Sequence, residues 1–221
     1  MDRNLGATSA TPGDVGALGL LYQWGRKDPF LGSSSISSAI EAKSTASWPS
    51  AISSNSTNGT IKYATAYPTT FIKYNSSNHD WYYTGSSTTD NTRWTTSTAT
   101  KSIYDPCPSG WRVPDGGNNG IWSKALGSSS SFQDALLYDS TNRGMNFSGK
   151  FGSDQTIWYP ASGYLSRNVG SIKWAGNNGD YWSASPYGSY AFGLNFSSGD
   201  NVNPSSGGDR ACGRSVRCLQ E

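Results

Sequence analysis

The sequence predicts an α+β domain built from short antiparallel strands, about two short helices and long loops. No long amphipathic helical period is visible, and Gly, Pro, Ser and Asn recur every few residues, which is typical of short strands joined by many turns. Aromatic residues make up 13% of the 221-residue chain, with 9 Trp and 13 Tyr. Because a buried Trp or Tyr removes roughly 150–250 Å² from water, these residues can build a core although only 34% of the chain is hydrophobic. The length fits one large domain spanning residues 1–221.

Two short segments are the candidates for the helices. Gly16 to Gly25 is mostly apolar, and Ser131 to Tyr138 begins with a serine suited to cap a helix and carries an aspartate in the first turn. Between them, Ser33 to Tyr74 and Thr84 to Ser102 are polar, low in complexity and interrupted by single aromatic residues. We expect these two segments to be long surface loops, and loops beyond roughly 12–15 residues are commonly functional or disordered.

The last third of the chain predicts a meander of antiparallel strands, because short runs there are bounded by Gly, Asn and Pro. The runs are Thr156 to Pro160, Gly170 to Trp174, Asp180 to Ser185, Tyr190 to Phe196 and Arg214 to Leu219. In the fourth run, alternation places on one face Tyr190, Phe192, Leu194 and Phe196. We expect that face to be core, although one pair of strand ends must face solvent.

The charge distribution excludes several kinds of partner. The chain has 17 Lys+Arg against 15 Asp+Glu, and neither sign gathers into a run, so we expect no nucleic-acid partner. No stretch approaches the roughly 20 apolar residues of a membrane-spanning helix, so we expect no direct membrane insertion. The first residues also lack a secretory signal, which leaves a cytoplasmic protein or a part of a longer secreted one. A surface rich in Ser, Thr, Asn and Gly favours the second alternative.

Cysteine and histidine usage bears on redox compartment and metal binding. The only histidine is His79, and the three cysteines, Cys107, Cys212 and Cys218, show no CxxC spacing, so a structural zinc site is not expected. We predict a disulfide between Cys107 and Cys218 with one thiol left over, which suits an oxidising compartment. The alternative is that all the thiols are unpaired and buried.

Catalytic and cofactor chemistry are poorly supported. One histidine, few carboxylates and no nucleophile elbow offer little acid–base machinery, so we predict that the protein is not an enzyme and binds no cofactor. The turns Asp115 to Gly120 and Gly176 to Asp180 carry oxygen ligands that suit calcium. Turn chemistry explains both equally well and the full calcium-loop pattern is missing, so no metal is predicted.

The tryptophans fall into two groups. Those within hydrophobic runs are expected in the core: Trp111, Trp122, Trp158, Trp174 and Trp182. Those that stand alone in polar loops are better candidates for stacking on a ligand, although anchoring a loop is the commoner role: Trp48, Trp81 and Trp94.

Specific motifs, in a specific order, run through nearly the whole chain. They are Met1 to Ala7, Leu21 to Phe30, Asp105 to Pro114, Tyr181 to Ser183 and Arg214 to Cys218. In these segments the chain resembles the Fibrobacter succinogenes major paralogous domain. The resemblance implies a C-type lectin-like fold and a secreted or surface-anchored binding module at the C-terminal end of a longer precursor, as in fimbrillin-like tip proteins of gut anaerobes. It further implies an extracellular location, outer-membrane anchored or fimbrial.

The C-terminal stretch also resembles the variable region of proteins diversified by retroelements, in which adenines of Asn codons are mutagenised. The corresponding segment runs from Asn201 to Arg217 and carries Ser, Gly, Asp, Cys and Arg, all reachable from an Asn codon by changing its adenines. Lys, Gln, Glu, Met and Trp are not reachable in this way, and Ser185 to Arg214 contains none of them. The resemblance therefore marks residues 180–217 as a candidate variable region. It assigns Cys107 and Cys218 to the framework and makes Cys212 a chance outcome of variation.

A ligand-binding surface is expected in this region, because Tyr, Ser, Gly and Asn are favoured in binding loops. Its candidate residues are Tyr187, Ser189, Tyr190, Phe192, Asn195, Ser197, Ser198, Asp200, Ser205, Ser206, Asp209, Cys212 and Arg214. Equally, these can be ordinary turn residues between strands. The predicted function is an adhesin-type domain that binds a protein or glycan on another cell, a phage or a host surface. The alternatives are a structural fimbrial subunit, whose partners are other pilus subunits, and a glycan-binding lectin.

Overall fold

The computed structural model describes residues 1–36, 51–74, 78–95, 100–134, 137–147 and 157–221, and in these ranges it is α+β and mostly β. The helical elements are η1 (Val15–Ala17), α1 (Ile61–Ala66) and α2 (Ile121–Leu126). The first strands are β1 (Leu20–Gln23), β2 (Phe30–Leu31), β3 (Ile52–Ser53), β4 (Ile72–Lys73), β5 (Trp111–Arg112), β6 (Phe132–Gln133), β7 (Tyr138–Asp139) and β8 (Gly144–Asn146). The remaining strands are β9 (Trp158–Pro160), β10 (Tyr164–Leu165), β11 (Ile172–Lys173), β12 (Asn178–Tyr187), β13 (Tyr190–Ser197), β14 (Asn201–Asp209), β15 (Gly213–Ser215) and β16 (Leu219–Gln220).

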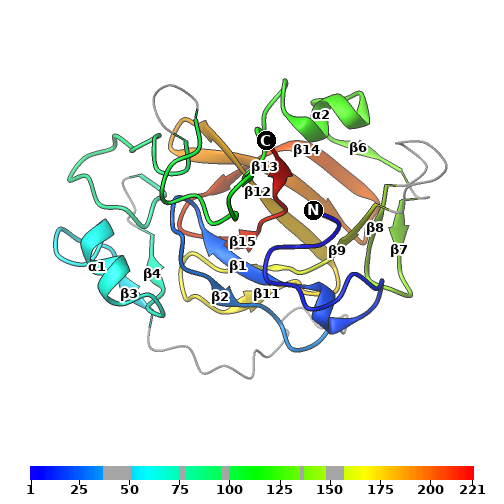
Figure 1. Cartoon of the computed structure of the whole chain (residues 1–221), viewed down its shortest axis with the longest axis horizontal. Coiled ribbons are helices and arrows are strands. Elements are labelled where there is room, and N and C mark those ends of the chain that lie inside the picture. The colour runs from blue at the N-terminus through cyan, green and yellow to red at the C-terminus, as the bar shows by residue number, and fades with distance from the viewer. Residues whose placement is uncertain (37–50, 75–77, 96–99, 135–136, 148–156) are drawn as a thin grey trace.

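The long strands β12, β13 and β14 pair in antiparallel order across the middle of the molecule (Figure 1), and of these three β12 and β13 correspond to predicted runs. The three strands belong to a nine-stranded sheet whose main path is β11-β10-β15-β12-β13-β14-β6, with β1 and then β2 added beside β15. The predicted run from Thr156 to Pro160 contributes β9, which belongs to a separate sheet with β7 and β8. The expectation of antiparallel pairing is wrong in the main sheet where β12 and β15 run parallel, with Tyr181 paired to Ser215, and outside it where β3 and β4 run parallel. The predicted run Arg214 to Leu219 is divided between β15 and β16, and β14 was not predicted as a strand.

Alternation along β12 packs the sheet between two hydrophobic clusters. Tyr181 belongs to a cluster with Leu194 and Phe196, whereas its neighbour Trp182 belongs to a cluster with Trp24 on the opposite face. All five side chains are fully buried. Successive side chains of one strand therefore hold both halves of the core.

Burial along β13 changes from one strand end to the other. Leu194 and Phe196 are fully buried on the face that alternation predicts, whereas Tyr190 and Phe192 on the same face are only half-buried. The expectation of a core face therefore holds for the second half of β13 and not for its first half.

The predicted helix at Gly16 to Gly25 is wrong. A short turn, η1, is followed by Gly19 in the left-handed conformation with φ of 71°, and Leu20–Gln23 then runs as strand β1. β1 pairs on one side with β15, where Leu21 lies opposite Ser215, and on the other with β2. A short apolar run suits a helix or a buried strand equally, and here distant partners select the strand.

The predicted helix at Ser131 to Tyr138 is wrong in its described part. Phe132 and Gln133 pair with Val202 and Asn201 of β14, and Tyr138 begins β7. Residues 135–136 lie outside the described ranges. The described part of this segment therefore forms β6, the edge strand beside β14, although its local sequence signals suit a helix.

Neither described α-helix lies where a helix was expected: α1 lies in a segment predicted as a loop, and α2 follows the predicted turn Asp115 to Gly120. α1 begins after Thr60, whose hydroxyl accepts a hydrogen bond from the amide of Tyr63, and it lies within the segment expected to be loop up to Tyr74. That segment also holds β3 and β4, and its residues 37–50, including Trp48, lie outside the described ranges. α2 ends at Gly127 with φ of 67°, a left-handed cap.

The predicted disulfide between Cys107 and Cys218 is confirmed, with 5.8 Å between the two Cα atoms and 111 residues between them in sequence. The two chain ends lie together, because the Met1 nitrogen donates to the Cys218 carbonyl at 2.7 Å and the Leu5 amide donates to the Val216 carbonyl (Figure 1). None of the described helices is long and apolar enough to cross a membrane.

The tryptophans of the polar loops that the structure describes take the commoner role and anchor their loop. Trp81 and Trp94 are fully buried, and their indole nitrogens donate to the carbonyls of Trp24 and Arg26, so neither is free to stack on a ligand. Trp174, expected in the core, is 37% exposed because it occupies a turn after β11 in the left-handed region. Three of the other tryptophans expected in the core are buried: Trp122, Trp158 and Trp182. The fourth, Trp111, is half-buried.

A buried ionic network fixes the loop around Trp81 to the end of β14. The Asp80 carboxylate pairs with Arg93 and lies 3.7 Å from Arg210. The Arg93 guanidinium packs over the rings of Trp24 and Trp81, and the Arg210 guanidinium lies 4.3 Å from the Trp24 centroid. Burial lowers the pKa of Arg210 to about 10, which leaves it charged at neutral pH.

Candidate ligand-binding site

An open groove of about 720 Å³ lies between the turn that precedes α2 and the strands β12 to β14. This volume is within the roughly 300–1,000 Å³ usual for small-molecule sites. The groove is lined by Gly116, Gly117, Asn118, Asn119, Ser129, Tyr187, Phe192, Asn203, Ser205 and Gly207. We call this set the β-sheet groove.

Backbone contacts and glycines bring the turn close to the sheet. The Ala184 amide donates to the Pro114 carbonyl at 2.8 Å, and the Gly116 amide donates to the Ser185 hydroxyl at 3.0 Å. A Cβ at Gly116 would lie 2.2 Å from the Ser183 Oγ, so a side chain at this position would push the turn off the strand. One wall of the groove is therefore set by close backbone approach.

The other wall presents two stacked aromatic rings. Tyr187, which is 53% exposed, and Phe192 have centroids 4.5 Å apart and an interplanar angle of 26°. Both strands next to β13 are irregular here, since the β12 register shifts between Trp182 and Pro186 and the β14 register shifts opposite Leu194. Such bulges change the direction of side chains at a sheet surface.

The groove offers amides, hydroxyls and aromatic faces, and none of its lining residues is charged. Asn118, Asn119 and Ser205 supply side-chain donors and acceptors. The Asn203 side chain is partly engaged, because its Oδ1 accepts a hydrogen bond from the Ser205 amide at 3.1 Å. The arrangement suits binding through stacking and neutral hydrogen bonds, without ion pairing.

The structure brings only some of the sequence-predicted ligand residues into this groove. Tyr187, Phe192 and Ser205 line it. Ser189 lies in the turn between β12 and β13, and Asn195 donates from Nδ2 to Asp180 at 3.2 Å. The remaining partly or fully exposed candidates lie elsewhere on β13, β14 and their connecting turn, namely Ser197, Ser198, Asp200 and Ser206.

Asp209 and Tyr190 belong to an ionic cluster. The Asp209 carboxylate lies 2.6 Å from Nδ1 of His79 and also pairs with Arg167. The Tyr190 hydroxyl lies 3.4 Å from Nε2 of His79, and the Arg167 guanidinium packs over the Tyr74 ring. The only histidine of the chain therefore ties the 78–79 turn to β13 and the end of β14.

The expectation that Cys212 and Arg214 belong to an exposed surface is wrong. Cys212 is 6% exposed within the Trp24 cluster, and Arg214 packs its guanidinium 4.5 Å from the Trp182 centroid and 3.5 Å from the Asp180 carboxylate. Because β15 is an inner strand of the main sheet, its residues and the turn before it are covered. Both side chains therefore pack in the core and are not available to a ligand at the surface.

No protein-family model, curated protein or solved structure matches the chain.

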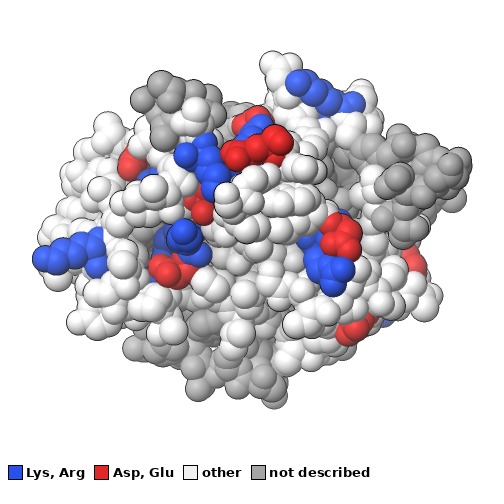
Figure 2. All heavy atoms as spheres, in the orientation of Figure 1, with Lys and Arg blue, Asp and Glu red and all other residues white. Residues whose placement is uncertain are grey.

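Charge on the face shown in Figure 2 is sparse, and most of it lies in small groups of opposite sign. Exposed examples are Arg112 with Asp115 at 2.7 Å and Arg3 with Asp2 at 2.8 Å. Within the described residues, no group of three or more His, Cys, Asp or Glu side chains is placed to hold a metal ion.

Sequence reasoning missed the turn wall of the groove. Gly116, Gly117 and the two asparagines that follow were considered only as calcium or turn residues. The run of Asp, Gly and Asn was a signal for a tight turn, but its position against β12 depends on contacts about 70 residues away in sequence.

The buried thiol makes a first testable prediction. Burial raises the pKa of Cys212 to about 11, and only the thiolate reacts with disulfide reagents. We expect Ellman's reagent at pH 8 to label the native protein at least about 100-fold more slowly than the urea-unfolded protein. Rapid labelling of the native protein would contradict the buried position, and a Cys212→Ser variant identifies the reacting thiol.

Proposed function

We propose that this chain is an adhesin-type domain that binds its ligand in the β-sheet groove and presents variable side chains from β12 to β14 on a C-type lectin-like scaffold. The observation that carries the proposal is the exposed ring of Tyr187 stacked on the half-buried ring of Phe192, in a groove within the candidate variable region. Rigid aromatic area flanked by small polar side chains is a common composition of binding surfaces.

The C-type lectin-like scaffold is proposed because the family-like motifs meet in one framework. The strand within Leu21 to Phe30 pairs with the strand in Arg214 to Cys218, and the latter pairs with β12 at Tyr181. The disulfide joins the last motif to Asp105 to Pro114. The motif segments, although far apart in sequence, thus contact one another in the folded chain. This arrangement suits a constant scaffold that carries variable surface residues.

An extracellular or cell-surface location is part of the proposal. The disulfide suits an oxidising compartment. The sparse, paired charge on the face in Figure 2 suits recognition of a protein or glycan on another surface better than binding to nucleic acid.

The groove is tested by a pair of matched tyrosine variants. Tyr187 and Tyr67 are each 53% exposed, but Tyr67 lies just after α1, away from the groove. The labelled domain is applied to a panel of intact gut bacteria, phage particles and epithelial cells and read by flow cytometry or sedimentation. We expect Tyr187→Ala to weaken binding about tenfold or more, the usual loss at a central aromatic contact, and Tyr67→Ala to leave it unchanged.

Two outcomes would count against the groove. Equal binding by both variants would place the contact surface elsewhere. Polymerisation of the purified chain, without binding to any member of the panel, would favour the structural fimbrial subunit.

Diversification is tested by sequencing the flanking genome. A reverse transcriptase gene beside a near-copy of the segment that encodes Ser185 to Arg214 is expected. In that copy, codons for surface residues such as the exposed Ser198 and the half-buried Ser205 should read as Asn, whereas the codon for the buried Arg214 should agree in both copies. A genome with neither the gene nor the copy would leave the chain an undiversified member of its kind.

A further inference from the structure

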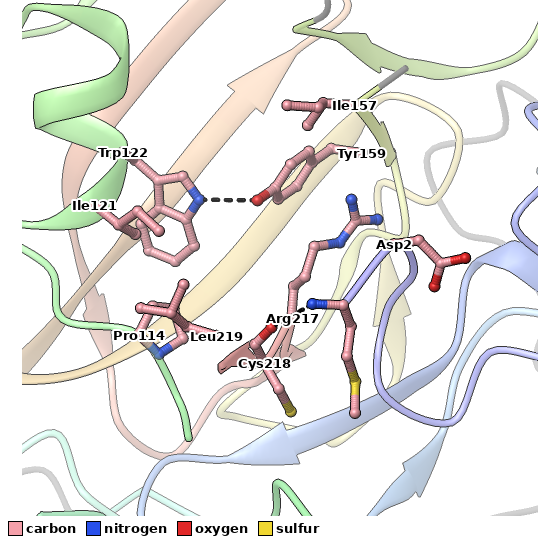
Figure 3. Close-up of a pocket in the computed structure, with 10 residues that line it drawn as sticks. Asp2, Pro114, Ile121, Trp122, Ile157, Tyr159, Arg217, Cys218 and Leu219 are labelled. Atoms are coloured by element: carbon pink, nitrogen blue, oxygen red, sulfur yellow. Dashed lines mark hydrogen bonds between the residues drawn. The ribbon is translucent and has the colours of Figure 1, made fainter. Parts of the chain in front are cut away.

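A second cavity, of about 390 Å³, lies near the chain ends and shares no lining residue with the β-sheet groove. Figure 3 shows Ile121, Trp122 and Pro114 facing Tyr159 and Arg217 across it. Its lining is mostly apolar and comes from α2, β9, β16 and the first residues of the chain.

One cation in this cavity lacks an anion. Arg217 is 7% exposed, and its Nε and Nη2 both donate to the neutral Oδ1 of Asn4, at 3.3 and 3.1 Å. Its guanidinium packs 4.0 Å from the centroid of the Tyr159 ring. Within the described residues, Nη1 has no hydrogen-bond partner and no carboxylate lies within ion-pair distance of Arg217.

The other buried arginines of the described chain differ in this respect. Each has a carboxylate within 4 Å: Arg93 and Arg210 share Asp80, Arg214 has Asp180 and Arg26 has Asp28. A buried charge without a counter-charge is costly, because its lost hydration is not replaced. Arg217 is therefore the buried arginine whose surroundings still require an anion.

The groups next to Arg217 leave room for that anion. Asp2, the acidic residue of the lining, is turned toward solvent and bound to Arg3 by two hydrogen bonds of 3.0 and 2.8 Å. The Tyr159 hydroxyl accepts a hydrogen bond from Nε1 of Trp122 at 3.2 Å, and no described residue accepts its own proton. The cavity thus offers two donors within an apolar wall.

We propose that this cavity binds a small organic carboxylate with an aromatic or branched apolar body. The carboxylate pairs with Nη1 of Arg217, and the body packs against Trp122, Ile121 and Leu219. A charge-assisted bond to a buried guanidinium supplies orientation, while the apolar wall supplies most of the binding free energy. The site is independent of the β-sheet groove.

The test compares acids with their uncharged amides. Phenylacetate, indole-3-acetate and 4-methylpentanoate, each beside its amide, are titrated at pH 7 while NMR follows the indole N–H signal of Trp122, assigned from a Trp122→Phe variant. We expect at least one acid to bind with a dissociation constant of about 1 mM or tighter, and its amide about tenfold more weakly. If no acid binds, or acid and amide bind equally, the proposal is overturned.

Two variants locate the site. Arg217→Met should abolish the preference for acid over amide, and Leu219→Trp should block the cavity while leaving the Asn4 contact in place. Tyr187→Ala in the β-sheet groove should leave the dissociation constants of both acid and amide unchanged. If Arg217→Met does not fold, the comparison of acid with amide on the unaltered chain and the Leu219→Trp variant still decide the matter. Acid binding that survives Leu219→Trp would place the site elsewhere and overturn the proposal.

Discussion

An Asp80→Asn variant is expected to lose about 3–5 kcal/mol of unfolding free energy, or to fail to fold. Asp80 is fully buried and supplies the carboxylate that Arg93 and Arg210 share. Its Oδ1 also accepts a hydrogen bond from the Tyr82 amide at 3.1 Å. Asparagine keeps the size of the side chain but leaves the guanidinium groups of Arg93 and Arg210 without their shared carboxylate. The loss of unfolding free energy therefore reports the contribution of the negative charge on Asp80. Urea unfolding, followed by tryptophan fluorescence, gives the change.

The matched control is Asp115→Asn, which removes a carboxylate from an exposed pair with Arg112. Its side chain is 56% exposed, so we expect a change of about 0–1 kcal/mol. A loss for Asp80→Asn no larger than that of the control would show that the buried network does not hold the 78–95 loop.

Removal of the disulfide is expected to have the other large effect. Cys107 and Cys218 are 111 residues apart, and opening so long a loop in the unfolded chain costs about 2–5 kcal/mol of stability. For a chain of this size that corresponds to a fall of roughly 10 °C in Tm. Calorimetry on the oxidised protein and on a Cys107→Ala, Cys218→Ala double variant measures the change.

The control for this prediction is the reductant. The Tm of the double variant should not respond to dithiothreitol, whereas the unaltered protein should fall toward the Tm of the double variant. Cys212→Ala in the otherwise unaltered chain should keep the response to dithiothreitol. A reductant-insensitive Tm in the unaltered protein would mean that the bridge does not contribute to stability.

Local pattern was sufficient where several signals agree. Alternation and the flanking Gly and Asn residues predicted β12 and β13, and the absence of any long helical period predicted the mostly β composition. The predicted pairing of Cys107 with Cys218, which the framework resemblance also implies, is present. Three of the predicted ligand residues, Tyr187, Phe192 and Ser205, line the β-sheet groove, and their ligand role stays a prediction.

Local pattern failed where the deciding partner is distant. The short apolar run of β1 suits a helix and a buried strand equally well. Pairing with β15, which is distant in sequence, makes it a strand. Trp81 and Trp94 stand among polar residues, yet they are buried, because the 78–95 loop folds onto the arginines that Asp80 neutralises. A composition-based expectation of exposed loops cannot include such a network.

The sequence by itself determined the chemical character of this protein: aromatic rings for a core, small neutral polar residues for a surface, and a pair of framework cysteines. The tertiary structure decided which side chains reach solvent. It buried Cys212 in the Trp24 cluster and Arg214 against Trp182, and it placed the Gly116 turn against β12. It also left Arg217 without a carboxylate partner among the described residues. The physical reason is that burial and charge pairing are set by groups that meet only when the sheet forms, whereas residue type and spacing are local properties of the chain.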